Sequence, residues 1–376
     1  MSVKLQVIME ALEQLAPRRL AEEWDRVGLQ LGQGAQEIRR VLVALDVNEA
    51  VAAEAKKVEA DLIVAHHPFI FKPLEQIHTD RFPGKLLQQF LRDNVALVAA
   101  HTNLDYATGG LNDWLAEALE LQNVDVLQAG PEEKLLKLVV FVPVEAVEAV
   151  QDALARAGAG HIGRYSHCSF QSAGEGTFLP LEGTNPYKGK QGKLERTPEI
   201  RLETILPQRI SGRALRAMLR SHPYEEVAYD LYPLVNERRE GGLGRIGLLR
   251  GEMTLAELAK QVARKLDLPG VRLVGDSQKI IRKAAVCGGA GSSLIGKAAF
   301  RGADVLITGD IKYHEAQQAQ NSGLALLDAG HFGTEKLMVG KVAQYLLEQS
   351  VAGKWNVEVI AAQSERDVFS WEPCGE

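Results

Sequence analysis

The sequence predicts an α/β protein in which a smaller α+β unit interrupts a domain of layered helices and strands. Short, near-continuous apolar runs alternate with helical stretches near both ends of the chain, a pattern typical of a parallel or mixed sheet covered on both faces. The middle of the chain instead follows the order β-α-β-β-α-β, which is that of a ferredoxin-like unit. We therefore expect residues 1–128 and 241–376 to form the two halves of one α/β domain, with residues 129–240 inserted between them.

Size and composition support a folded protein of about two domains. The chain has 376 residues, of which 46% are hydrophobic and 24% are charged. The net charge of −6 argues against a protein that mainly binds nucleic-acid phosphates. No apolar stretch approaches the roughly 18 residues of a membrane span, and the N-terminal segment resembles a helix rather than a secretory signal. Three cysteines at unrelated spacings, Cys168, Cys287 and Cys374, predict neither a disulfide scaffold nor a zinc ribbon. We expect a cytoplasmic protein that does not contact membranes.

The first part of the chain begins with a predicted helix over residues 5–15, where apolar residues recur at helical spacing until Pro17 follows. Three apolar runs then predict strands, and the stretches between them predict helices. The predicted strands are residues 41–45, 62–65 and 95–100, and the predicted helices are residues 50–58 and 84–92.

The last part of the chain repeats this alternation. A capping box at Thr254 and Glu257 predicts the start of a helix that runs to about Leu266. A second helix is predicted over residues 335–347. The predicted strands are residues 284–287, 305–308, 324–327 and 357–360.

The inserted unit contains two predicted helices, residues 144–157 and 211–222. Its predicted strands are residues 134–142, a hairpin that begins near 166–170, residues 199–207 and residues 227–234. Residues 184–199 are rich in Gly, Pro and Lys, which predicts an exposed loop.

Polar residues that can bind metal follow four of the predicted strands. Ligands of open α/β sheets bind beyond the carboxyl ends of the strands, and five of the nine histidines lie there together with two carboxylates. These residues are His66, His67, His101, Asp105, His314, His331 and Glu335. Histidine and carboxylate without cysteine suit zinc, iron or manganese. His331 and Glu335 are four residues apart, so a helix would place them on one face.

A two-metal site explains the adjacent pair His66 and His67, because the backbone turns at a strand end and lets the two side chains reach different ions. Glu335 can bridge two ions through its two oxygens. Two divalent ions carry +4, and Asp105 plus Glu335 supply −2. The remaining +2 favours a further anion, such as hydroxide or a substrate phosphate. We expect two divalent metal ions per chain and a small anionic ligand.

Several neighbouring residues have simpler interpretations. We expect Asp310 to cap a helix, and Asp46 either to line the same cleft as the predicted ligands or, as the commoner role, to cap a helix. His101 and His314 are better suited to contacting substrate or transferring protons than to binding metal. The backbone N–H groups of the Gly-rich segment 287–293 could hold an anion. The segment lacks the GK[ST] of a phosphate-binding loop, however, so a tight turn is the favoured interpretation.

One further segment, 166–168, contains Ser166-His167-Cys168. Adjacent residues of a strand point to opposite faces, so we do not expect His167 and Cys168 to form a nucleophile pair. His222 and the residues after it are most simply a helix end and a turn.

Several of these motifs resemble one known family, the GTP cyclohydrolase I type 2 homologues, also called NIF-three-like proteins. The matching segments are Ala65 to Pro68, His101 to Asp105, Thr308 to Asp310 and Gly330 to Glu335. Glu23 to Leu29 is similar to the opening motif of the family, with Arg26 where Asn is usual. Tyr165 to Cys168 and His222 to Glu226 resemble segments of the longer bacterial members, whose inserted domain is similar to the PII and CutA proteins.

The resemblance implies a dinuclear metal site. In it, His67 and Asp105 would hold one ion, His66 and His331 the other, and Glu335 both. It also implies a toroidal homohexamer with the metal sites facing an internal cavity. The family name implies opening of the GTP ring, and therefore a metal-dependent hydrolase that acts on a nucleotide-like or other anionic small molecule. The alternative is a non-enzymatic regulatory or metal-handling protein that acts through its inserted domain.

Overall fold

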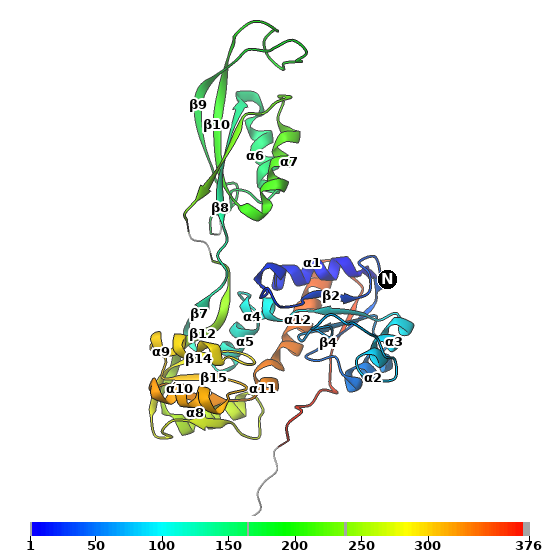
Figure 1. The fold of residues 1–376 in the computed structure, drawn as a ribbon, viewed down its shortest axis with the longest axis vertical. Helices are drawn as coiled ribbons and strands as arrows, with labels where there is room; N and C mark the ends of the chain where they lie inside the picture. Colours follow the sequence, from blue (N-terminus) through cyan, green and yellow to red (C-terminus); the bar gives the residue numbers. More distant parts are fainter. Residues whose placement is uncertain (1, 164, 237–238, 371–376) are drawn as a thin grey trace, which may run out of the picture. The chain divides into compact units, whose positions relative to one another are not determined.

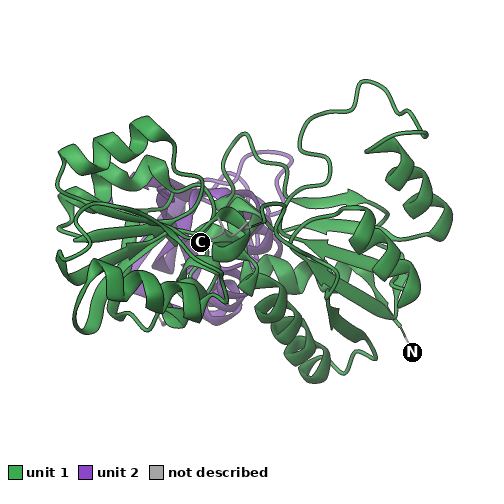
Figure 2. Cartoon of the chain, turned by 90° about the horizontal axis from the view of Figure 1, so that it is seen from below, with its two compact units in different colours: residues 1–131, 240–376 green, residues 132–239 purple. Residues whose placement is uncertain are grey.

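The computed structural model describes residues 2–163, 165–236 and 239–370. Cys374 lies outside the described residues. The chain divides into two compact units (Figure 2). The larger unit combines Met1–Pro131 with Glu240–Glu376, and the inserted unit is Glu132–Arg239. Each unit is a mixture of helices and strands, as the sequence predicts at the level of an α/β fold. No helix among the described residues combines the length and the apolar character needed to cross a membrane.

The first sheet of the larger unit has five strands in the order β17-β4-β5-β6-β2 (Figure 1). Four of them are parallel, and β2 pairs antiparallel with β6. Strands β5 and β6 are apolar along their whole length, and β4 is apolar after Arg40, because helices cover both faces of the sheet. Helices α2 and α3 pack on one face, and α1 and α12 pack on the other. The bounds are α1 (Leu5–Leu15), β2 (Gly28–Leu31), β4 (Arg40–Ala44), α2 (Glu49–Lys57), β5 (Leu62–Ala65), α3 (Gly84–Asp93), β6 (Ala96–Ala99), α12 (Leu337–Ala352) and β17 (Glu358–Ala361).

A second sheet in the larger unit has six strands in the order β13-β16-β15-β14-β12-β7. Its three inner strands β14, β15 and β16 are parallel, and the other three pair antiparallel. Helices α5 and α8 pack on one face, and α9 and α10 pack on the other. The bounds are α5 (Leu111–Ala118), β7 (Gln122–Ala129), β12 (Gly242–Thr254), α8 (Leu255–Lys265), β13 (Arg272–Val274), β14 (Ile280–Val286), α9 (Ile295–Phe300), β15 (Val305–Thr308), α10 (Tyr313–Asn321) and β16 (Ala325–Asp328).

The larger unit therefore contains two sheets with separate cores, rather than one continuous sheet. Two short helices lie at the strand ends, α4 (Thr102–Tyr106) after β6 and α11 (His331–Glu335) after β16. Helix α12 follows α11 directly but packs on the first sheet, so the chain crosses from the second sheet to the first at α11. The capping box predicted at Thr254 and Glu257 is present at the start of α8. A small sheet pairs β1 (Val3–Lys4) with β3 (Glu37–Ile38).

The inserted unit has a four-stranded antiparallel sheet in the order β11-β8-β10-β9. Its two helices, α6 and α7, contribute to one apolar core with β8 and β10. The bounds are β8 (Leu135–Pro143), α6 (Val147–Arg156), β9 (Ser169–Phe178), β10 (Glu195–Pro207), α7 (Ser211–Ser221) and β11 (Tyr229–Leu234).

Two expectations for the inserted unit need correction. The loop predicted over residues 184–199 ends at Leu194, because Glu195 to Glu199 pair with Phe178 to Gly174 as the first part of β10. The side chains of this segment alternate between the two faces of the sheet, with Arg196 and Pro198 exposed and Thr197 and Glu199 buried. His167 and Cys168 precede β9 instead of lying in a strand, and His167 has a left-handed backbone with φ of 60°.

Candidate metal centre

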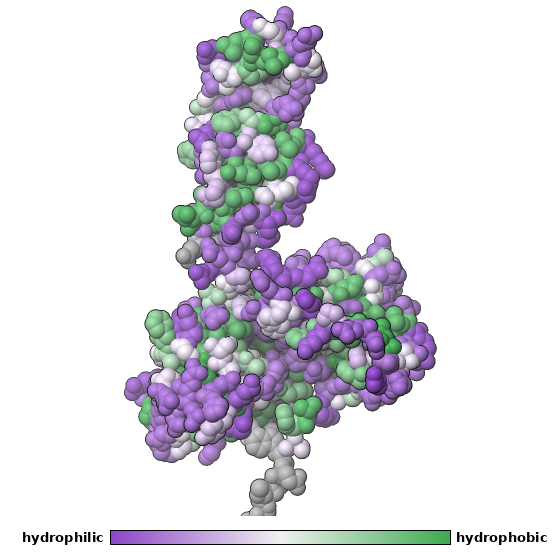
Figure 3. All heavy atoms as spheres, in the orientation of Figure 1, coloured by the Kyte–Doolittle hydropathy of each residue, from purple (hydrophilic) through white to green (hydrophobic). Residues whose placement is uncertain are grey.

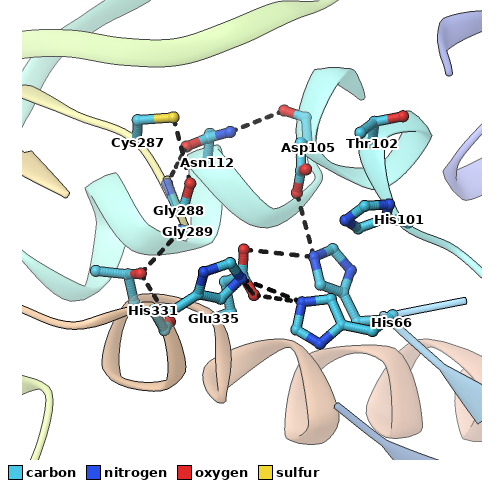
Figure 4. Close-up of polar contacts among 12 residues, drawn as sticks. His66, His101, Thr102, Asp105, Asn112, Cys287, Gly288, Gly289, His331 and Glu335 are labelled. Carbon is cyan, nitrogen blue, oxygen red and sulfur yellow. Dashed lines mark hydrogen bonds and ion pairs between the residues drawn. The ribbon is translucent and has the colours of Figure 1, made fainter. Parts of the chain in front are cut away.

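The carboxyl ends of the parallel strands in both sheets supply the side chains of one polar cluster (Figure 4). His66 and His67 follow β5, and His101 and Asp105 follow β6. His331 and Glu335 are the first and last residues of α11, after β16. The rings of the adjacent His66 and His67 do not point apart as they would within a strand, since their centroids are only 5.1 Å apart. The turn after β5 thus directs both rings into the same cluster.

Each of the four histidines has its Nδ1 atom fixed by an oxygen outside the centre. His66 bonds the carbonyl oxygen of Ala100 at 2.7 Å. The other three bond carboxylates: His67 contacts Asp46 at 2.8 Å, His101 contacts Asp25 at 2.9 Å, and His331 contacts Asp310 at 2.7 Å. A bond of this kind fixes the orientation of a metal-binding histidine and leaves its Nε2 available to the ion.

The Nε2 atoms of His66, His67 and His331 meet around the Glu335 carboxylate, which is 2% exposed. Glu335 Oε2 lies 3.0 Å from the Nε2 atoms of both His67 and His331, and those two nitrogens are 3.2 Å apart. Glu335 Oε1 lies 3.7 Å from His66 Nε2, which is also 3.5 Å from Asp105 Oδ1. These contacts place His67 beside His331 and His66 beside Asp105. The division of the ligands between two ions that the resemblance implies, His67 with Asp105 and His66 with His331, stays a prediction.

The residues present fit a metal ion. His66 Nε2 and Asp105 Oδ1 are buried without a hydrogen-bond partner among the described residues. Leaving such atoms unpaired is costly, so their presence requires an explanation such as an ion. The ligand atoms of His66, His67 and His101 lie within 4.8 Å of one another, and so do those of His67, His331 and Glu335. Nitrogen and carboxylate oxygen atoms at these separations form a suitable donor set for zinc, iron or manganese.

The electrostatics of the cluster favour positive charge. Burial opposes protonation of His67, but its hydrogen bonds to Asp46 and Glu335 raise its pKa to about 10. The hydrogen bond to Glu335 raises the pKa of His331 to about 9. Burial would lower the pKa of His66, yet the carboxylates of Glu335 and Asp105 raise it. Burial would likewise raise the pKa of Glu335, but the surrounding histidines hold it well below its ordinary value. The same groups that stabilise a proton here would stabilise a metal cation.

The turn after β14 positions Glu335 from the opposite side. Gly289 has φ of 59°, and a Cβ atom on it would lie 2.3 Å from Glu335 Oε1. The backbone N–H of Gly289 donates to Thr334 Oγ1 at 2.9 Å, and that of Gly288 donates to Asn112 Oδ1 at 3.0 Å. Only a residue without a side chain allows this close approach. The Gly-rich segment after Cys287 is therefore a tight turn, as the sequence indicated, and it lies against the Glu335 carboxylate.

Other predicted residues have different positions. His314 is exposed on α10, bonds Gln317 at 3.0 Å, and is not brought together with the cluster. The caps expected from Asp46 and Asp310 are wrong, because both carboxylates bond histidines instead. Asn48 caps α2, and α10 begins after Lys312.

Sequence reasoning missed the role of two residues. Asp25 accepts the His101 Nδ1 hydrogen bond and one from the Thr102 backbone N–H at 3.0 Å. Asn112 donates to the Asp105 carbonyl oxygen at 2.9 Å. Asp25 lies in the segment that resembles the opening motif of the family, which was the available signal. Asn112 had none.

The fold and this cluster define a class: two-sheet α/β proteins with a candidate metal centre at the carboxyl ends of their strands. The chain belongs to the family described as Duf34/NIF3 (NGG1p interacting factor 3), whose match covers residues 3–368. A Bacillus subtilis protein named GTP cyclohydrolase 1 type 2 homolog is 46% identical over 370 residues, covering 98% of this chain and 99% of the relative.

Two solved structures are similar over almost the whole length. A Bacillus cereus protein described as related to NIF3 has 47% identity and a TM-score of 0.90. A Staphylococcus aureus protein has 29% identity and a TM-score of 0.81. Each comparison covers 98% of this chain and 99% of the other.

Proposed function

We propose that this protein binds two divalent metal ions through His66, His67, Asp105, His331 and Glu335. One observation carries the proposal: the three histidines His66, His67 and His331, each fixed at Nδ1, have Nε2 atoms 3.0–3.7 Å from the oxygens of one buried carboxylate. Ion pairs alone do not account for this arrangement, because His66 Nε2 and Asp105 Oδ1 are buried without a hydrogen-bond partner among the described residues. Glu335 has one oxygen facing His67 and His331 and the other facing His66, so it would be the residue that holds both ions.

We further propose a metal-dependent hydrolase that acts on a nucleotide-like or other anionic small molecule. Divalent ions, when bound, would polarise a phosphoryl or carbonyl group and offset negative charge on the substrate. His101 lies at the edge of the cluster with its Nδ1 held by Asp25, so its Nε2 can accept or donate a proton. The names of the relatives suggest GTP as the first substrate to test. His314, predicted beside His101 for proton transfer, is the weaker candidate because it is exposed on α10.

The alternative is a non-enzymatic regulator or metal-handling protein that acts through the inserted unit. The observation that favours it is a cavity within that unit, lined by residues of β9 and β10. The strand order β11-β8-β10-β9 supports a ferredoxin-like domain of the PII or CutA kind. A toroidal homohexamer and a cytoplasmic location also remain predictions, and light scattering of the purified protein tests the first of them.

The test of the metal proposal is elemental analysis of the purified chain beside a Glu335→Gln variant. We expect about two ions per chain in the unaltered protein, as in other two-metal sites, and a loss of at least half of this content in the variant. Glu348→Gln is the matched control, because that carboxylate is exposed on α12 and bonds only Gln344 among the described residues. A protein that neither contains nor takes up zinc, iron or manganese would overturn the proposal.

The hydrolase proposal is tested separately, with GTP, other nucleotides and simple phosphoesters as substrates for the metal-loaded protein. Removal of a positioned proton donor or acceptor typically costs 10²–10⁴-fold in rate. We therefore expect His101→Gln to lower kcat by about this factor with unchanged metal content. A metal-loaded protein that turns over none of these substrates would favour the regulatory alternative.

A further inference from the structure

The inserted unit contains a cavity of about 570 Å³ that is separate from the metal centre. Strands β9 and β10 line it together with the segment before β11 and residues of the loop between β9 and β10. This volume lies within the usual range for small-molecule sites. We propose that the cavity binds a small organic cation, a protonated amine attached to an apolar body.

Three aromatic residues form one part of the cavity wall. The ring of Tyr224 lies 6.0 Å from that of Phe178 and 6.1 Å from that of Tyr187, measured between centroids. Aromatic faces attract cations through their quadrupole, and they also bury apolar surface. This wall is therefore suited to a ligand that is apolar and positively charged.

A buried carboxylate, that of Glu199, supplies negative charge to the cavity wall. Glu199 is 8% exposed and lines the cavity. Its Oε1 accepts a hydrogen bond from the Tyr224 hydroxyl at 2.8 Å. On the facing strand, a Cβ atom at Gly176 would lie 2.1 Å from Glu199 Oε2, so the glycine leaves the space that the carboxylate occupies. The nearby Gly174 faces open space. A buried carboxylate held by a neutral hydroxyl gains from a cationic partner.

The charges around the cavity disfavour an anionic ligand. Four glutamates line it, whereas Arg201 is the one lining cation among the described residues. Arg201 is itself paired with Glu203 at 3.1 Å, outside the lining. Of the glutamates, Glu175 is neutralised by Arg196 at 2.7 Å. The balance is negative, which disfavours a nucleotide or another phosphate here and favours an amine.

The side chains on the face drawn in Figure 3 alternate between hydrophilic and hydrophobic residues over both units, without one uniform apolar surface. The cavity is lined by aromatic rings and carboxylates. In this it differs from the candidate metal centre, where bound divalent ions would favour an anionic substrate.

The test measures binding of phenethylamine to the full-length protein by calorimetry, beside its anionic analogue 3-phenylpropionate. The two probes share the apolar body and differ in the sign of the charge. We expect saturable binding of phenethylamine and at least tenfold weaker binding of 3-phenylpropionate, because a charge-assisted contact contributes about 1.5–3 kcal/mol. Glu199→Gln should weaken phenethylamine about tenfold. Glu148→Gln, on an exposed position of α6 and outside the cavity lining, should leave it unchanged.

A second variant guards against a folding defect at Glu199. Gly174→Leu adds a side chain to the open space of the cavity and leaves the carboxylate in place, so it should abolish binding while the melting temperature stays close to that of the unaltered protein. Equal affinity for both probes, binding that survives both variants, or no saturable binding of phenethylamine up to about 10 mM would overturn the proposal.

Discussion

Asp46 lies outside the candidate metal ligands but contacts one of them, His67. Its carboxylate bonds His67 Nδ1 at 2.8 Å and so fixes the direction of His67 Nε2. Loss of such a partner typically costs 10–100-fold in metal affinity. We expect Asp46→Ala to weaken metal binding by this factor, measured by competition with a chelator of known affinity. Glu49→Ala is the control, since that exposed carboxylate bonds Lys85 on the protein surface. Equal losses in both variants would contradict the orienting role.

Gly289 supports a second prediction at this scale. A methyl group there would lie 2.3 Å from Glu335 Oε1, and the left-handed backbone adds strain to any side chain. We expect Gly289→Ala to displace Glu335, lower the metal content and destabilise the protein by about 1–3 kcal/mol. The measurements are elemental analysis and thermal unfolding.

Gly296 provides the matched control for this substitution. It lies within α9 with no atom within 4 Å of an added Cβ. Gly296→Ala should slightly stabilise the protein, by up to about 1 kcal/mol, because alanine is the better helix former. A Gly289→Ala protein with full metal content would show that the close approach to Glu335 is unimportant.

The residues of the candidate metal centre that the sequence predicted follow an apolar run, and those that it missed do not. His66, His67, His331 and Glu335 were predictable because each comes just after an apolar run. The partner Asp25 and the anchor Asn112 do not follow such a run, and they reach the cluster only through the tertiary fold. Asp46 and Asp310 were noticed but assigned to caps, because capping is the commoner role of an aspartate between strand and helix.

At the scale of elements, Arg245 joins pieces of structure that are distant in sequence. It lies on β12 and is 2% exposed. Its guanidinium makes a two-point contact with Asp113 of α5 and donates to the carbonyl oxygen of Ala107, after α4, at 3.1 Å. Removing one member of a buried ion pair typically costs about 3–5 kcal/mol. Arg245→Met should lower the free energy of unfolding by this amount.

Tryptophan fluorescence during urea unfolding measures this loss in the larger unit, because no tryptophan lies within residues 132–239. The control is Arg282→Met, whose exposed pair with Glu252 should contribute at most about 1 kcal/mol. Similar midpoints for the two variants would show that the buried pair is dispensable.

The elements themselves were largely predictable, because apolar runs and helical periodicity are local signals. The helix over residues 5–15 has the predicted bounds. The pairing of the strands into sheets was less predictable than the strands themselves. Apolar runs do not indicate which strands pair, so the separation into two sheets and the return of β17 to β4 appear only in the structure. The first part of β10 was missed because its polar composition resembles a loop.

At the scale of the whole molecule, the inserted unit enters and leaves the larger one at neighbouring points. Within the inserted unit, Leu135 and Leu234 are paired across β8 and β11. Within the larger unit, Ala129 and Gly242 are paired across β7 and β12. The chain ends that an excision would create therefore lie side by side, and each unit has its own apolar core. These are the conditions under which a domain can be removed without loss of the remainder.

We expect a variant in which residues 130–241 are replaced by Asn-Gly to fold, because this dipeptide favours a two-residue hairpin and would join the paired residues Ala129 and Gly242. All the candidate metal ligands lie outside the deleted segment, so the metal content per chain should equal that of the full-length protein, whereas phenethylamine binding should disappear. The excised 132–239 fragment should retain that binding and unfold cooperatively by circular dichroism. A deletion variant that folds without metal would show that the inserted unit contributes to the metal centre, and the two units could then no longer be treated as separate sites.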